Sequence, residues 1–392
     1  MNLSPWPNYS LEEAEAAKNI ILSGQVNYWT GDKGKSFEKE YADWSNCKYA
    51  LTMANGTLAL TAAYKAIGLK ESDEIITTPR TFIATTSAAA LTGANPVFAD
   101  VDRDSGAITV ESIEPLINKK TKAISVVHLG GWPADMVKIC QLAKSYDLFV
   151  IEDCSQAHGA KIEIDKKLRS VGSFGNIGTW SFCQDKIITT GGEGGMVTTN
   201  DKNLWEQMWS YRDHGKGYDS YFRRDHPPGY KWVTESFGTN FRMTEIQSEI
   251  GRIQLKKMDS WNKIRTENAI FLYENLKDLS ILRIPMPSEN LKHAWYKFYV
   301  YLKPENISSD WNRSRILEEI NACGYKALTG SCSEVYLESC FKDKSFCPSI
   351  RLPIAKELGE TSLMFLVHPG IHKEEMYNYV ETIKKILYKA TL

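Results

Sequence analysis

The region from Tyr49 to Glu152 alternates short runs rich in β-branched residues with longer segments of helical character. The short runs predict strands at Tyr49–Met53, Glu74–Thr78, Pro96–Asp100, Lys122–Val127 and Leu148–Glu152. Segments between them, such as Thr57–Ile67 and Asp135–Tyr146, are long enough to be crossover helices. Strands joined in this way run parallel, in a sheet covered on both faces. A sheet of this kind binds its ligand at the carboxyl ends of the strands.

The flanking segments extend this sheet and predict a second, smaller domain. Ser10 to Glu13 carries the capping-box pattern of a helix that runs to about Ser23. Two more strands, Gly178–Phe182 and Met196–Thr199, bring the large sheet to seven. A long helix over Thr244–Lys277 leads to a strand near Trp295–Leu302 and helices near Ser314–Asn321 and Lys373–Lys389. We therefore expect an α/β large domain over residues 1–245 and a small α+β domain over 246–392, joined by the long helix.

The charge and hydropathy of the chain exclude several classes of protein. The formal net charge is −1, whereas a protein that binds nucleic acid normally carries a basic excess. No stretch approaches the roughly 20 apolar residues of a membrane-spanning helix, and no basic segment followed by an apolar one opens the chain. The eight cysteines form no Cys-x-x-Cys pair, so neither zinc nor a redox pair is suggested. We expect a cytoplasmic protein with reduced thiols and no metal.

Lys186 lies between an apolar run and a glycine-rich turn that ends at Gly195. An amine must lose a proton before it attacks a carbonyl, and burial or a cationic neighbour makes that loss easier. The glycines allow the backbone to approach a ligand closely. Alone this signal is weak, because most of the 47 Lys and Arg residues are expected to be solvated surface charges.

Two upstream positions could supply partners to the same ligand. Gly56-Thr57 joins the strand Tyr49–Met53 to the following helix, whose first N–H groups could bind a phosphate. The alternative is an ordinary glycine turn with a threonine cap. Asp153 follows the strand Leu148–Glu152, where a buried carboxylate needs a partner. That partner is either a protonated ring nitrogen of a ligand or a group of the protein itself.

Together these three features favour one cofactor. Pyridoxal 5'-phosphate needs helix N–H groups for its phosphate, a carboxylate for its ring nitrogen and a lysine for its aldehyde carbon. The predicted topology places all three at one edge of one sheet. We therefore predict that the chain binds pyridoxal phosphate.

A series of motifs resembles the DegT/DnrJ/EryC1/StrS family of sugar aminotransferases, over the chain from about Thr30 to Gly370. The motifs are Gly56-Thr57, Thr78-Pro-Arg-Thr-Phe82, Val127-His-Leu-Gly130, Val150-Ile-Glu-Asp153 to His158-Gly159, Ser181-Phe to Lys186, Gly192-Glu-Gly-Gly195 and Asn240 to Gln247. The resemblance implies the fold-type I aminotransferase fold and a homodimer with shared active sites. It also implies transfer of an amino group to a keto carbon of a nucleotide-linked sugar.

The same resemblance implies roles for individual residues. Lys186 and Asp153 would be the catalytic residues, on the aldehyde carbon and the ring nitrogen of the cofactor. The other implied cofactor contacts are Gly56, Thr57 and Ser181 on the phosphate, Phe82 stacked on the ring, Gln156 on the ring hydroxyl, and Asn240 on the phosphate of the neighbouring subunit.

The chain departs from the family pattern just after the lysine. Relatives usually have Asn there and a single glycine before Glu-Gly-Gly, whereas this chain has Ile187 and the pair Gly191-Gly192. The turn after Lys186 is therefore expected to be one residue longer. Dehydratases that resemble this family replace the lysine with histidine, so the retained Lys186 favours transamination over dehydration.

Candidate substrate residues come from two polar and aromatic segments. The diphosphate of a sugar nucleotide needs cations, and the loop Tyr211–Lys231 offers Arg212, Arg223, Arg224 and Lys231 as a clamp. A surface loop with solvated charges is the alternative. Candidates for the sugar pocket are Tyr28, Trp29 and Thr30, although aromatic pairs belong more often to a core or an interface. His293 matches a family residue, and its role stays open.

The resemblance favours L-glutamate as amino donor, and a 4-keto-6-deoxy sugar is our best guess for the acceptor, in amino-sugar or surface polysaccharide biosynthesis. One alternative is a dehydratase on the same scaffold that acts on sugar nucleotides. The other is a non-catalytic regulator that binds pyridoxal phosphate or a sugar nucleotide. Retention of Lys186, Asp153 and Gln156 argues against the regulator, because a binding protein does not need the lysine.

Overall fold

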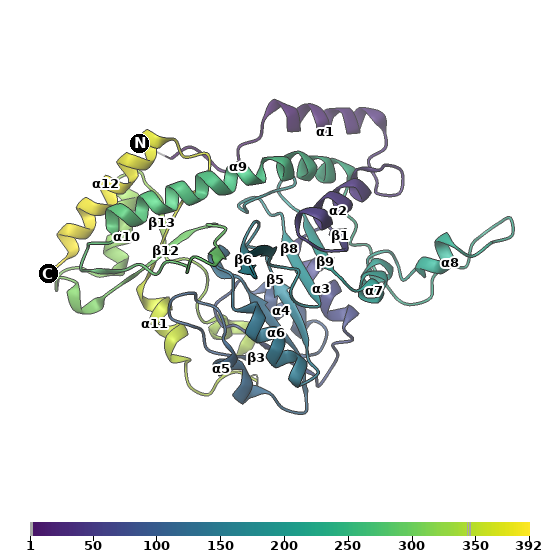
Figure 1. The fold of residues 1–392 in the computed structure, drawn as a ribbon, viewed down its shortest axis with the longest axis horizontal. Helices are drawn as coiled ribbons and strands as arrows, with labels where there is room; N and C mark the ends of the chain where they lie inside the picture. Colours follow the sequence, from purple (N-terminus) through teal and green to yellow (C-terminus); the bar gives the residue numbers. More distant parts are fainter. Residues whose placement is uncertain (1–2, 343, 345) are drawn as a thin grey trace.

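Residues 3–342, 344 and 346–392 are described by the computed structural model shown in Figure 1. Its central sheet has seven strands in the order β1-β9-β8-β5-β4-β2-β3. Their bounds are Tyr49–Met53 (β1), Glu74–Thr77 (β2), Asn95–Phe98 (β3), Thr121–Val127 (β4), Phe149–Asp153 (β5), Ile177–Ser181 (β8) and Gly195–Thr199 (β9). All neighbouring pairs from β3 to β8 are parallel, whereas β9 is antiparallel to β1 and β8. The predicted α/β class and mostly parallel seven-stranded sheet are confirmed.

Both faces of this sheet are buried, because alternate strand residues enter different apolar clusters. Leu51, Ile151 and Val197 pack with α3 and α7 on one face. Their neighbours Ala50 and Met196 pack in a cluster on the other face. The helices of this part of the chain are α1 Leu11–Ser23, α2 Lys33–Trp44, α3 Gly56–Ala66, α4 Ala84–Ala90, α5 Val110–Ile113, α6 Met136–Ser145 and α7 Lys202–Arg212. The first of them begins with the predicted capping box of Ser10 and Glu13.

The long helix α9 (Glu245–Leu276) leads from this region to a second sheet (Figure 1). That sheet has the order β10-β12-β14-β13 and packs with α9, α10 and α12 around one apolar core. The bounds are β10 Leu282–Arg283, β12 Phe298–Leu302, α10 Arg313–Ala322, β13 Ala327–Leu328, α11 Pro353–Thr361, β14 Ser362–Phe365 and α12 Lys373–Ala390. Leu3, at the other end of the chain, also packs against this core. The division into domains at residues 245 and 246 stays a prediction.

Some elements differ from those expected. The strand expected from Trp295 begins only at Phe298, because Trp295 has a left-handed φ of 49°, which a strand cannot accommodate. A small sheet of β6 (Lys161–Ile164), β7 (Lys167–Ser170) and β11 (Leu291–Lys292) was not predicted. Its hairpin turns at Asp165 and Lys166, which have φ values of 49° and 62° and lack the glycine that marks such turns in a sequence.

The loop expected after Tyr211 contains a short helix, α8 (Tyr218–Phe222). In Figure 1, α8 and the loop that follows it extend away from the body of the molecule. We call residues 217–239 the arm. Its most exposed side chains are large and aromatic: Tyr230, Trp232 and Phe237. Within the described residues, no helix combines the length and the hydropathy needed to cross a membrane.

Candidate active site

A cavity of about 620 Å³ opens at the carboxyl ends of β4, β5 and β8. Its volume lies within the usual range for sites that bind small molecules. Residues from the first turn of α3, the turn after β8 and the segment 330–332 complete its wall. It is lined by seven of the predicted cofactor residues, namely Gly56, Thr57, Phe82, Asp153, Gln156, Ser181 and Lys186.

The first turn of α3 forms one end of the cavity. Asn55 caps this helix, since its side-chain oxygen accepts a 3.0 Å hydrogen bond from the Leu58 N–H. Gly56 and Thr57 follow as the first helical residues, where backbone N–H groups have no partner within the helix. A Cβ atom on Gly56 would lie 2.6 Å from the Ser181 Cβ, so only glycine allows β8 to come this close. The arrangement offers an anion the N–H groups of Gly56 and Thr57 and the hydroxyl group of Ser181.

Asp153 lies at the end of β5, with only 5% of its surface exposed. One carboxylate oxygen accepts a 2.8 Å hydrogen bond from the Thr85 hydroxyl, and the other a 3.1 Å bond from the Ser155 N–H. The Thr85 hydroxyl also lies 2.8 Å from that of Thr81. Sequence reasoning missed both threonines: Thr85 lies in the first turn of α4, and Thr81 lies in the bend just before that helix.

Lys186 is fixed through both of its backbone groups. Its N–H donates to the Cys183 carbonyl at 3.1 Å, and its carbonyl accepts from the Trp6 indole N–H at 2.8 Å. The ammonium lies 5.0 Å from the ring centre of Tyr296, whose hydroxyl donates to Asp185. Neither Trp6 nor Tyr296 carries a signal in the sequence that links it to the lysine.

The turn after Lys186 contains the departures from the family pattern. Ile187 is fully buried in the apolar cluster with Phe182, so its side chain does not line the cavity. Gly191 and Gly192 have left-handed φ values of 79° and 111°, which glycine adopts readily. None of these three residues lines the cavity to which Lys186 belongs.

Gln156 is held by hydrogen bonds in the cavity, whereas Phe82 is largely exposed there. The side-chain oxygen of Gln156 accepts a 2.8 Å hydrogen bond from the Gly130 N–H, and its nitrogen lies 3.5 Å from the Ser331 hydroxyl. This oxygen is therefore engaged, and the amide nitrogen is the group that can donate to a ligand. Phe82 keeps 65% of its surface exposed, so one face of its ring is accessible to a planar ligand.

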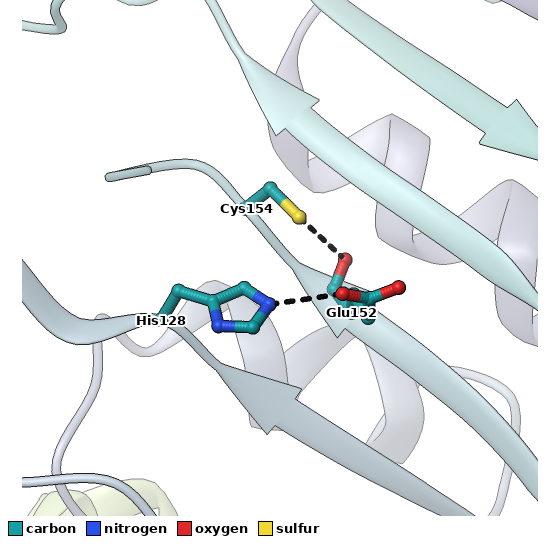
Figure 2. A group of neighbouring side chains, drawn as sticks. All are labelled: His128, Glu152 and Cys154. Carbon is teal, nitrogen blue, oxygen red and sulfur yellow. Dashed lines mark hydrogen bonds and ion pairs between the residues drawn. The ribbon is translucent and has the colours of Figure 1, made fainter. Parts of the chain in front are cut away.

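A buried cluster of His128, Glu152 and Cys154 lies beside Asp153 (Figure 2). These residue types can bind metals, but here the carboxylate is already saturated. Its oxygens accept from the backbone N–H groups of Gly172, Phe174 and Gly175 and lie 3.1 Å from His128 Nε2. The other His128 nitrogen accepts from the Ala134 N–H, so Nε2 carries the proton and donates. The four donors use the four lone pairs of Glu152, and the cluster holds the end of β5 in place.

Two buried histidines near the site are neutral. Burial lowers the pKa of His158 to about 3, and its ring packs against Trp180 and Phe182. Burial likewise lowers the pKa of His293 to about 3. His293 was a candidate for substrate binding, but it does not line the cavity, and its Nδ1 accepts the Trp295 N–H at 2.8 Å. This hydrogen bond to the backbone of Trp295 explains the position of the His293 ring.

The structure also places other substrate candidates away from the cavity. Arg212 is fully buried, pairs with Glu38 at 2.9 Å and lies over the Tyr28 ring at 4.2 Å. The Tyr28 hydroxyl donates to the same carboxylate at 3.0 Å. Arg212 is therefore not the exposed clamp residue that the sequence predicted. The reason is that it is the last residue of α7 and faces the core, whereas the prediction placed it in an exposed loop.

Trp29 and Thr30 also have partners within the chain. The Trp29 indole N–H donates to Asp213 at 2.9 Å, and its ring packs against Tyr221. The Thr30 hydroxyl donates to the Asn27 carbonyl at 3.0 Å. Neither side chain lines the cavity.

Arg223, Arg224 and Lys231 belong to the arm, and Asn240 follows it directly. All are exposed, and none lines the cavity of the same chain. Among the described side chains that line the cavity, Lys186 is the only cation, beside the carboxylates of Asp153, Asp185 and Glu193. The cavity of the single chain therefore offers little positive charge to an anionic ligand.

Known proteins resemble the chain over nearly its whole length. An aminotransferase structure from Psychrobacter cryohalolentis is 51% identical, with a TM-score of 0.96 and 99% of each chain covered. GDP-perosamine synthase of Escherichia coli O157:H7 is 39% identical over 360 residues, which are 91% of this chain and 92% of that protein. The dTDP-3-amino-3,6-dideoxy-alpha-D-galactopyranose transaminase of Aneurinibacillus thermoaerophilus is 31% identical over 382 residues, covering 97% and 96%.

The sequence model of one family matches residues 8–384. It is described as the DegT/DnrJ/EryC1/StrS aminotransferase family, and it is the family that the motifs around Asp153 and Lys186 resemble. Aminotransferases with this fold use pyridoxal phosphate, which agrees with the lysine, the carboxylate and the helix N-terminus found in the cavity. The chain is therefore a pyridoxal phosphate-dependent member of the DegT/DnrJ/EryC1/StrS aminotransferase family.

Proposed function

We propose that this enzyme transfers an amino group from L-glutamate to a keto carbon of a nucleotide-linked sugar, with a 4-keto-6-deoxy sugar as first choice. The observation that carries the proposal is the meeting of Lys186, Asp153 and the first turn of α3 in one cavity. Relatives named for GDP- and dTDP-linked amino sugars support the substrate class. Their nucleotides differ, so the nucleotide of this enzyme has to be found by experiment.

The residues of the cavity fit the cofactor group by group. We assign its phosphate to the N–H groups of Gly56 and Thr57 and to the Ser181 hydroxyl, which the absence of a side chain on Gly56 allows to lie close to the helix N-terminus. We assign its ring nitrogen to Asp153, which is buried and held by Thr85. The exposed ring of Phe82 would stack on the cofactor ring, and the Gln156 amide would donate to its hydroxyl.

When bound, pyridoxal phosphate supplies an electrophilic aldehyde carbon and a ring that accepts electron density from the reacting carbon. Lys186 Nζ would bind the aldehyde carbon and, once released by the donor, accept the proton that the donor's α-carbon gives up. The same nitrogen would return a proton in the half-reaction with the sugar. Asp153 would keep a proton on the ring nitrogen, because a buried carboxylate is stabilised by a positive partner.

The charge of the cavity supports a homodimer with shared sites. A cofactor phosphate, a sugar diphosphate and a glutamate are all anions, yet Lys186 is the only cation among the described lining side chains. The arm carries Arg223, Arg224 and Lys231 outward, together with exposed aromatic rings that an isolated chain would leave in water. We propose that this segment and Asn240 reach the cavity of a second copy. There its cations would bind the diphosphate.

Spectra and product analysis test this function. The protein loaded with pyridoxal phosphate is mixed with L-glutamate, and the absorbance of the cofactor should change as the amino group is taken up. GDP- and dTDP-linked 4-keto-6-deoxy and 3-keto sugars are then added, and mass spectrometry should find an amino sugar nucleotide. A deoxy product would favour the dehydratase, and binding without any product would favour the regulator.

A matched pair of lysine variants makes the test specific. Lys186→Ala should abolish the spectral change and the product. Lys297→Ala is the control, because the Lys297 side-chain nitrogen also lies near the Tyr296 ring, 4.6 Å from its centre, but does not line the cavity. The proposal fails if Lys186→Ala retains both signals.

A further inference from the structure

Trp6 makes a direct hydrogen bond to the backbone of the cavity lysine. Its indole N–H donates to the Lys186 carbonyl at 2.8 Å, across 180 positions of sequence. The Lys186 N–H is bound to Cys183 within the same turn. Of these two backbone hydrogen bonds of Lys186, the one from Trp6 therefore comes from a distant segment of the chain.

The N-terminal segment that carries Trp6 is anchored on the C-terminal part of the chain. We call residues 3–7 the strap. The Ser4 N–H and hydroxyl donate to the Glu375 carboxylate at 3.1 and 2.8 Å, at the start of α12. Leu3 packs against the apolar core around β12 and β14. The strap is thus attached to the part of the molecule that contains the second sheet and its helices, and we expect the two to move together.

The Trp6 ring is held by residues of the same region. It meets Trp261 of α9 edge to face, with ring centres 5.0 Å apart, and lies beside His368 at 5.9 Å. The Arg265 guanidinium lies 5.1 Å from its centre. Because these contacts fix the plane of the indole, they also fix the direction in which its N–H points.

We propose that Trp6 is a positioning residue for Lys186, and that the strap couples the C-terminal region to the lysine turn. This role rests on the proposed function of Lys186. An amine that binds the cofactor and then moves a proton must return to nearly the same place in every cycle, and small errors of placement are costly in rate. With both backbone groups bound, the Lys186 side chain starts from a fixed Cα atom.

Trp6→Phe tests the role by keeping an aromatic ring and removing the N–H. In cofactor-free protein, hydrogen exchange should become about three- to tenfold faster at the amides of Lys186, Thr189 and Thr190, as expected for the loss of one hydrogen bond. In the loaded enzyme, kcat should fall by a similar factor, about three- to tenfold, while KM for both substrates changes less than about twofold.

Trp261→Phe is the matched control, because Trp261 touches the Trp6 ring but makes no hydrogen bond to Lys186. It should leave exchange in the lysine turn unchanged, because phenylalanine keeps an aromatic ring against the Trp6 indole. The proposal is overturned if Trp6→Phe exchanges like the wild type at this turn, or if both variants speed exchange equally. This readout needs no turnover, so it separates failure of the inference from failure of the proposed function.

A second variant covers the case in which Trp6→Phe does not fold. Ser4→Ala removes one anchor of the strap and leaves the Trp6 ring intact. It should speed exchange at the same turn by about twofold, since one weaker bond is lost. An unchanged turn in a folded Ser4→Ala protein would show that the strap is not coupled to the lysine.

Discussion

Asp153 depends on one hydroxyl group of a neighbouring helix. The Thr85 hydroxyl donates to it at 2.8 Å, and Thr81 lies within hydrogen-bonding distance of Thr85. A buried carboxylate that loses a donor is left with an unpaired oxygen, which costs more than the bond itself contributed. The three side chains therefore act as one group that sets the direction of the carboxylate in the cavity.

Thr85→Val should lower kcat/KM by about tenfold, because it replaces the donor to Asp153 with a methyl group of similar volume. It should also weaken cofactor binding, measured by titrating the cofactor-free protein and following tryptophan fluorescence. Thr85→Ser keeps the hydroxyl and should stay within about threefold of the wild type. Equal loss in both variants would contradict the hydrogen-bond argument and indicate a packing effect instead.

His158 makes the folded protein sensitive to acid. Burial lowers its pKa to about 3, below the ordinary value of 6.5, so between these values the unfolded chain binds more protons than the folded one. Stability is therefore lost as the pH falls through this range. At pH 5 the loss from His158 alone should be about 2 kcal/mol.

His158→Phe should remove this loss, because phenylalanine packs between Trp180 and Phe182 without a group to protonate. Urea unfolding of cofactor-free protein at pH 5 and pH 7.5 measures it, and the difference between the two pH values should shrink by about 2 kcal/mol. The exposed His214, changed to Asn, is the control. If both variants keep the wild-type difference, His158 is not the source.

At the scale of elements, β5 and its neighbours are held by Glu152. Its carboxylate accepts from three backbone N–H groups of the loop before β8 and from His128 at the end of β4 (Figure 2). The glutamate thus joins two strand ends and a loop directly behind Asp153. A charged acceptor that is fully satisfied in this way stabilises a buried site without any metal.

Glu152→Gln should destabilise the fold by about 3 kcal/mol, because the new NH2 group faces donors and cannot accept from them. Thermal unfolding of the cofactor-free protein measures this. Glu163→Gln, on the exposed side of β6, should change stability by less than about 0.5 kcal/mol. A Glu152→Gln protein that is as stable as the control would refute the four-donor description.

At the scale of the whole molecule, the arm predicts that each site is built from two chains. Its most exposed aromatic rings, Tyr230, Trp232 and Phe237, and its exposed cations belong to a segment that extends from the body of the molecule. The cavity of the same chain has no cation other than Lys186 among its described lining residues. If a second copy supplies them, a lysine defect in one chain and an arm defect in the other should fall in the same site, which leaves the second site of the dimer intact.

Mixing two inactive variants tests this arrangement. Lys186→Ala is combined with an Arg223→Ala/Arg224→Ala/Asn240→Ala chain, and the two are exchanged by mild dilution and reassembly. Hybrid dimers have one intact site, so random mixing should restore about a quarter of the wild-type activity. Each variant alone should remain nearly inactive. Absence of any recovery, with hybrids verified by mass spectrometry, would exclude sharing of the site.

The sequence by itself determined the parts of this protein that depend on local patterns. Alternating strands and helices predicted the parallel sheet, since periodicity is set by neighbours along the chain. Gly56, Asp153 and Lys186 lie at or just after the carboxyl ends of strands of that sheet, so the topology alone places them at one edge. Their residue types then indicated the cofactor.

Only the tertiary structure decided which side chains hold these residues in place, and which of the predicted loop residues are exposed to a ligand. Trp6 reaches Lys186 across 180 positions, and no local pattern encodes such a contact. Arg212 looked like a loop cation, but Glu38, 174 positions away, draws it into the core. The physical reason is the same in both cases. Hydrogen bonds and ion pairs between distant segments depend on how the elements pack, and packing is a property of the whole fold.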